Sequence, residues 1–159
     1  MAKFTARGID AYISQLSDVY TDVNPIINRA VFEGAKIIAD EVTEKIRGIP
    51  DAQMQNNGLV WGISKSQKKG LLEGFGISHM IVDDYNLRYV KLGFVGYNDT
   101  VTDKYRRGQP NAMIARSLIS GTSFRSKNDF MTSALREVRV KANKAIEETF
   151  QNELEKLQK

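Results

Sequence analysis

The sequence predicts an α+β fold, with N-terminal helices and a long C-terminal helix packed on a small antiparallel β-sheet. Apolar residues recur at helical spacing near both ends of the chain, whereas in the middle they alternate with glycine and polar residues. The chain has 159 residues, of which 42% are hydrophobic, and this is enough for one hydrophobic core. We therefore expect a single domain that spans residues 1–159.

Two amphipathic helices are expected in the first third of the chain. Apolar residues follow helical spacing over residues 8–20, and a second apolar face runs over residues 26–46. Pro25 follows an asparagine, an arrangement typical of an N-cap and the first helical position, so we expect a helix boundary there and two nearly continuous helices. Within the second helix, Gly34 and Ala35 predict the close approach of another helix.

The middle of the chain is expected to form a β-hairpin. Before it, residues 51–70 read as a polar loop, then a short strand or apolar plug around Trp61, then a basic turn. Two runs of alternating apolar residues flank the turn sequence Asp-Asp-Tyr-Asn, so the hairpin is predicted over residues 71–95. The glycines in and beside its strands predict bulges or close backbone approach: Gly74, Gly76, Gly93 and Gly96.

A short helix and a long one are expected in the last third of the chain. Residues 99–110 are polar and predict an exposed loop, and residues 111–120 follow it with helical apolar spacing. Phe130 opens an apolar stripe that keeps helical spacing for about thirty residues. Because the stripe is longer than one small core needs, we expect its end to dock on the N-terminal helices or on a neighbouring subunit.

A tightly specified bend separates these two helices. Gly121 and Thr122 end the short helix, since glycine takes the left-handed conformation of a helix C-cap without a steric penalty. Ser126 and Asp129 stand at the spacing of a capping box, just before Phe130. Such control over a loop predicts that its position matters, for packing or for contact with a partner.

No residue type or motif indicates catalysis, a cofactor or a metal ion. The chain has no cysteine and one histidine, which excludes disulfides, thiolate metal sites and multi-histidine sites. It contains no P-loop and no nucleophile elbow. His79 lies on the apolar face of a predicted strand near Asp83 and Asp84, where a structural role is favoured. A small hydrolase that uses His79 is therefore the least favoured function.

Positive charge is concentrated in one segment. The net charge is +4, and residues 104–127 hold six basic residues and no acidic one, so the rest of the chain sums to −2. The six are Lys104, Arg106, Arg107, Arg116, Arg125 and Lys127. They are candidates for contact with DNA or with an acidic partner, or they form a solvated loop surface.

Neither a membrane span nor a signal peptide is predicted. No apolar run reaches the roughly 20 residues that cross a bilayer. The N-terminal residues lack the apolar core of a signal peptide, so we expect a cytosolic product.

Four short motifs follow one another along the chain. They are GAKIIAD at residues 34–40, GLLEGFGI at 70–77, KLGFVGYN at 91–98, and SGTS at 120–123 before Phe130. With the flanking helices, this order resembles the tailed-phage neck proteins of the head–tail joining or tail-completion family of siphophages and prophages. The resemblance covers nearly the whole chain.

The resemblance implies a small α+β subunit without enzymatic activity or cofactor. Subunits of this kind assemble as a ring between the head connector and the tail, in the path of the DNA, and can be monomers in isolation. The protein would then lie in the virion neck, and in the host cytoplasm during assembly. The alternative from the residues alone is a basic nucleic-acid-binding accessory protein, which predicts steeply salt-dependent binding to DNA through residues 104–127.

Overall fold

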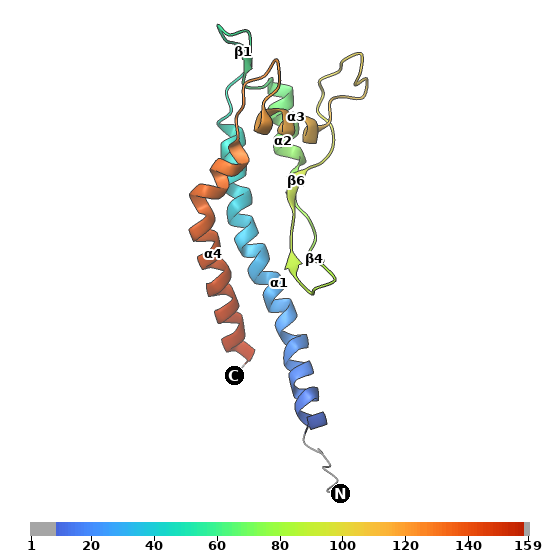
Figure 1. The fold of residues 1–159 in the computed structure, drawn as a ribbon, viewed down its shortest axis with the longest axis vertical. Coiled ribbons are helices and arrows are strands. Elements are labelled where there is room, and N and C mark those ends of the chain that lie inside the picture. Colours follow the sequence, from blue (N-terminus) through green and yellow to red (C-terminus); the bar gives the residue numbers. More distant parts are fainter. Residues whose placement is uncertain (1–8, 158–159) are drawn as a thin grey trace, which may run out of the picture.

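The computed structural model describes residues 9–157, with side chains from residue 23 onward, and it has the predicted α+β architecture (Figure 1). Its helices and strands, in chain order, are α1 (Ile9–Arg47), β1 (Gln53–Met54), β2 (Val60–Trp61), α2 (Lys65–Gly74), β3 (Phe75–Ile77), β4 (Ile81–Val82), β5 (Arg88–Tyr89), β6 (Leu92–Phe94), α3 (Asn111–Ser120) and α4 (Phe130–Leu157). Long helices at both ends of the described chain flank three small antiparallel sheets.

The two long helices, α1 and α4, lie side by side along most of α4 (Figure 1). The two helices approach closely at Gly34, where an added Cβ would lie 2.5 Å from Ile146 Cγ1 and 3.2 Å from the Ala142 carbonyl oxygen. The predicted close approach at Gly34 is thus confirmed, and the end of the C-terminal stripe docks on α1.

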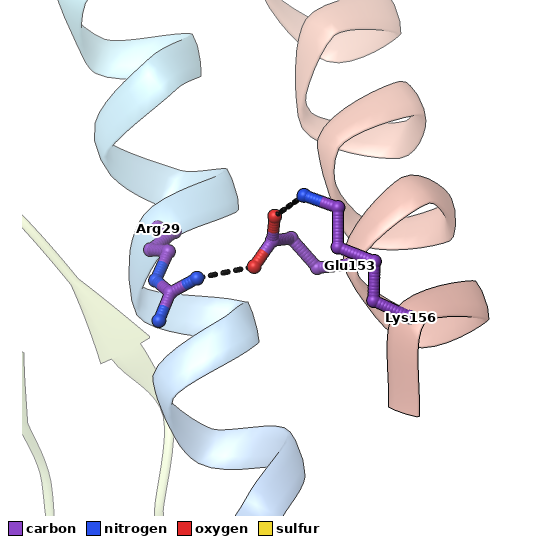
Figure 2. A network of polar contacts seen from close by, with 3 residues as sticks. All are labelled: Arg29, Glu153 and Lys156. Atoms are coloured by element: carbon purple, nitrogen blue, oxygen red, sulfur yellow. Dashed lines mark hydrogen bonds and ion pairs between the residues drawn. The ribbon is translucent and has the colours of Figure 1, made fainter. Parts of the chain in front are cut away.

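Ion pairs join α1 and α4 at both ends of their contact. Glu153 accepts hydrogen bonds from Arg29 and, at 2.5 Å, from Lys156, as Figure 2 shows. Nearer the other end, Lys45 Nζ donates to Glu137 Oε1 at 2.5 Å. Each pair has one well-exposed partner, Arg29 or Glu137, so each contributes little to stability at neutral pH.

Acidification is expected to weaken the contact between α1 and α4. The hydrogen bond from Lys156, with the charges of Lys156 and Arg29, lowers the pKa of Glu153 below its ordinary value of 4.5. A carboxyl group whose pKa is lower in the folded state stabilises the fold at pH values above its ordinary pKa. This stabilisation is lost as the pH falls through the folded-state pKa. Thermal unfolding should therefore depend less on pH on the acid side in Glu153→Gln, with little change at neutral pH. Identical acid-side curves for the two proteins would contradict this.

Helix α1 is continuous through Pro25, so the predicted boundary between two helices is wrong. Proline inside a helix removes one backbone hydrogen bond and crowds the preceding turn. Pro25 itself is exposed, and the next turn is held by the buried Ile26 and Ala30. Packing on one side and solvent on the other make the helix tolerate the proline.

The hydrophobic core gathers at one end of the molecule, where α2, α3, the C-terminal end of α1 and the start of α4 meet (Figure 1). We call this the core end. Its fully buried members include Val42, Ile46, Ile49, Ile63, Leu71 and Leu118. Phe94 links strands β3 and β6 to this core. The centroid of its ring lies 5.0 Å from that of Phe75 and 6.1 Å from that of Phe130.

The β-hairpin is confirmed, in the form of two short ladders. In the first, Gly76 pairs with Gly93 between β3 and β6; in the second, Ile81 pairs with Tyr89 between β4 and β5. The side chain of Asp83 closes the predicted turn by accepting from two backbone N–H groups. The hairpin lies along α1 and is tied to it by a 3.1 Å hydrogen bond from Arg88 to Asn28.

The residues before the hairpin form helix α2, not the predicted basic turn and strand start. Ser64 is the N-cap, and the Ser64 and Gln67 side chains complete a capping box. The Ser-x-x-Gln spacing of a capping box is present in the sequence, but the neighbouring lysines made the segment read as a basic turn. Strand β3 therefore begins at Phe75 and not at Leu71.

Candidate interaction surface

The predicted basic segment lies at the core end of the molecule. Lys104, Arg106 and Arg107 belong to the loop that joins β6 to α3, which projects from this end in Figure 1. Arg116 lies on α3 and Lys127 on the bend before α4, and all five side chains are exposed. Residues 51–127 contain eleven Lys and Arg against six Asp and Glu, so the positive charge of the chain is concentrated in this region.

Two buried asparagines hold the base of this loop. The backbone N–H and side-chain Nδ2 of Asn98 both donate to the Gln109 carbonyl, each at 2.9 Å. Asn111 donates from its backbone to the Gly96 carbonyl at 3.0 Å and from Nδ2 to the Val95 carbonyl at 2.9 Å. We call this arrangement the asparagine clamp. It fixes both ends of the loop to α3, so the loop leaves the core in a defined direction.

The asparagine clamp fits only because glycines surround it. An added Cβ at Gly74 would lie 2.2 Å from the Val95 carbonyl oxygen, and one at Gly70 would lie 2.5 Å from Asn111 Oδ1. Gly108 combines a φ of 94° with a Cβ position 1.9 Å from the Asn98 carbonyl oxygen. The predicted close backbone approach at Gly74 is confirmed, whereas the clamp itself was not predicted.

The exposed part of the loop carries large apolar side chains as well as cations. Val95, Tyr97 and Val101 are 74%, 65% and 64% exposed. We call these three residues, with Lys104, Arg106 and Arg107, the loop surface. These six residues of the clamped loop are the candidate contact surface.

The bend between α3 and α4 is fixed against β2. Gly121 ends α3 at the predicted C-cap position, with a positive φ of 72° but a ψ of 168°, so its conformation is not the left-handed helical one that was predicted. Thr122 and Arg125 then close a turn, in which the Thr122 N–H donates to the Arg125 carbonyl at 2.9 Å. Beyond the turn, the Ser126 N–H donates to the Val60 carbonyl at 2.9 Å, which pairs the bend with β2.

The predicted capping box at the start of α4 is wrong, although the helix does begin at Phe130. Asp129 caps the helix itself, since its Oδ1 accepts from the Thr132 N–H at 3.2 Å. The Ser126 hydroxyl instead donates to Gln55 Oε1 at 2.6 Å. Ser126 therefore ties the bend to the β1–β2 hairpin.

Arg125 is buried and does not belong to the exposed basic surface. Only 8% of it is exposed, and it donates to Gln67 Oε1 and to Ser117 Oγ, both at 3.3 Å. Its Nε has no hydrogen-bond partner among the described residues, and burial lowers the pKa of the guanidinium. Arg125 thus joins α2, α3 and the bend from inside.

Arg125→Ala is expected to lower the free energy of unfolding by about 2 kcal/mol, because it leaves a cavity and removes the hydrogen bonds from Arg125 to Gln67 and Ser117. Arg125→Met should cost less, since it fills the space and removes a buried charge that has no carboxylate partner. Urea unfolding of both variants measures the difference. Equal losses in the two, or none in either, would contradict this role.

The residues that could suggest catalysis are not assembled into a site. His79 is exposed between β3 and β4, not on a buried strand face, and the Asp83 carboxylate is engaged in the turn. Among the side chains that the structure describes, residues 23–157, no group of three His, Asp or Glu is placed to hold a metal ion. Over residues 9–157, no helix is both long enough and apolar enough to cross a membrane.

Comparisons with protein-family models, with curated proteins and with solved structures found no match to the chain. We therefore infer its function from the order of its motifs and from the geometry of the core end.

Proposed function

We propose that the protein is a structural component of a tailed-phage neck, which completes the junction between head connector and tail by protein–protein contact. In this proposal it works as a homo-oligomeric ring, without catalysis and without a cofactor. The sequence motifs that carry the resemblance support it. The motifs at residues 70–77 and 91–98 contain the paired strands β3 and β6. They also supply Asn98 of the asparagine clamp and two glycines that make room for it, Gly70 and Gly74.

The observation that carries the proposal is the loop surface on its clamped base. A loop that is already fixed loses little conformational entropy when it binds, so its contacts contribute directly to affinity. Aromatic and aliphatic side chains beside cations are typical of a protein interface with a polar rim. An assembly part that must meet its neighbours in one orientation needs such a fixed surface.

The second candidate is a nucleic-acid-binding accessory protein, and it is favoured by the exposed cations of the loop surface. Burial of Arg125 weakens it, and so do Asp99 and Asp103, which flank the cations on the same loop. The exposed Val95 and Val101 suit a protein partner better than phosphates. Binding to duplex DNA with a steep salt dependence would favour this candidate.

The composition of purified phage particles tests the proposal. Tailed particles from the strain that encodes this chain should contain it in several copies per particle, measured by quantitative mass spectrometry. Capsids that have not yet gained a tail serve as the comparison. Absence of the chain from complete particles would overturn the proposal.

A further inference from the structure

The N-terminal part of α1 extends away from the rest of the molecule. In Figure 1 it continues past the end of α4 and past the β4–β5 hairpin. We call residues 9–22 the arm. The arm carries apolar residues at helical spacing, namely Ile9, Tyr12, Ile13, Leu16, Val19 and Tyr20. Because single helices of this length are marginal in water, the arm needs a partner for its apolar face.

The charged residues of the arm are all acidic. It contains Asp10, Asp18 and Asp22, and no Lys or Arg occurs from residue 9 to residue 28. Two arms placed against each other would therefore bring like charges together. A basic surface suits the arm better than another arm does.

The ribbon formed by β3 and β6 has an outer face without side chains at Gly76 and Gly93. Neither packing nor backbone conformation within the chain requires glycine at these two positions. Gly76 and Gly93 face each other across the ladder, and an added Cβ at either would meet nothing within 4 Å. Neither has a positive φ, so no backbone conformation demands glycine there. Glycine inside a strand weakens it, and close approach of another backbone is one use that offsets this cost.

This bare face is the floor of a shallow, mainly apolar groove of about 300 Å³. Ile77, Phe94 and the exposed Val95 contribute its apolar lining, and Lys91 is its charged residue. The groove has no acidic lining residue, and the loop surface with its three cations begins at Val95. We call it the glycine groove. Its character is complementary to that of the arm in both polarity and charge.

We propose that the arm of one copy docks in the glycine groove of the next copy. Gly76 and Gly93 let the helix lie close to the ribbon, as Gly34 lets α4 lie close to α1 within the chain. Since α1 is one continuous helix, an arm cannot turn back to the groove of its own chain. The contact joins two different surfaces, so it repeats head to tail and closes into a ring when the rotation permits. The inference rests on the proposed ring assembly and names its interface.

Disulfide trapping in the purified chain tests this interface, because the protein has no cysteine of its own. Leu16→Cys in the arm and Val95→Cys at the groove are made as separate variants and mixed under a mild oxidant. We expect a covalent dimer in the mixture, formed much faster than in either variant alone. Val140→Cys, which is 77% exposed on α4, is the matched control and should not cross-link to Leu16→Cys.

Two outcomes of the trapping would overturn the inference. One is a mixture that gives no more dimer than the control pair does. The other is Leu16→Cys dimerising fastest alone, which would mean that arms pair with each other. If the protein is present in phage particles but the disulfide does not form, only this inference is wrong. If the disulfide forms but the protein is absent from particles, only the proposed function is wrong.

Gly93→Val separates docking from folding. The added side chain enters open space on an extended strand, so the melting temperature should stay the same or rise. The same side chain fills the floor of the groove, so mixed-disulfide formation should fall to the control rate. Unchanged trapping by a folded Gly93→Val protein would contradict docking on this face.

Discussion

Gly74→Val is expected to lower the free energy of unfolding by about 3 kcal/mol or more. Even the first carbon of the new side chain would lie 2.2 Å from the Val95 carbonyl oxygen and 2.6 Å from Asn111 Nδ2. Neither group can move freely, since Asn111 Nδ2 donates to that same carbonyl. The substitution must therefore separate β6 from α2 or break the asparagine clamp. Urea unfolding followed by circular dichroism measures the loss.

Gly76→Val is the matched control, two residues further along the chain. Here the added carbon meets nothing within 4 Å, and the strand gains a β-branched residue. We expect unchanged stability or a gain of up to about 1 kcal/mol. If both substitutions destabilise the protein equally, the loss at position 74 does not come from the clamp.

Reversing the three cations of the loop surface, as Lys104→Glu, Arg106→Glu and Arg107→Glu together, is expected to prevent neck assembly while leaving the fold intact. All three side chains are exposed and make no ion pair among the described residues, so the free energy of unfolding should change little. If each reversal costs about 1 kcal/mol at a partner surface, the three together lower its affinity by on the order of 100-fold. The yield of infectious particles in a complementation assay measures this effect.

The control for charge alone is the triple reversal Arg139→Glu, Lys141→Glu and Lys144→Glu on the exposed side of α4. It changes the net charge by the same amount, away from the loop surface. We expect nearly normal particle yield from it. Equal loss in the two triple variants would show that net charge, not the loop surface, governs assembly.

Several elements could be predicted because their signals are local. Gly121 and Phe130 mark helix ends, and the structure has α3 ending at Ser120 and α4 beginning at Phe130. Gly34 predicts a close helix contact because a small residue in an apolar face has few other uses. The alternating runs around Asp83 predict the hairpin since strand period and turn chemistry agree.

Other features could not be predicted because they depend on contacts between distant residues. Pro25 reads as a boundary in sequence, and only the packing around Ile26 keeps α1 continuous. Ser126 has the spacing of a cap, yet Gln55, 71 positions away in the chain, takes its hydroxyl. Arg125 counts as a surface cation by composition, and nothing local indicates that its side chain turns toward Gln67.

The candidate surface was predicted in part. The exposed cations of the loop follow from the charge pattern, but the asparagine clamp does not, because Asn98 and Asn111 look like ordinary turn residues. Their burial at 4% and 2% appears only in the folded chain. A sequence signal does exist in the glycines at 70, 74 and 108, which mark the places where the clamp leaves no room for a side chain.

Deleting the gene that encodes the chain, and imaging the particles produced by electron microscopy, tests the central claim most directly. The proposed neck role predicts DNA-filled heads and separate tails that do not join, and that join again when the wild-type chain is supplied. The Gly74→Val chain should fail to restore joining. Normal tailed, infectious particles in the absence of the protein would contradict the neck role.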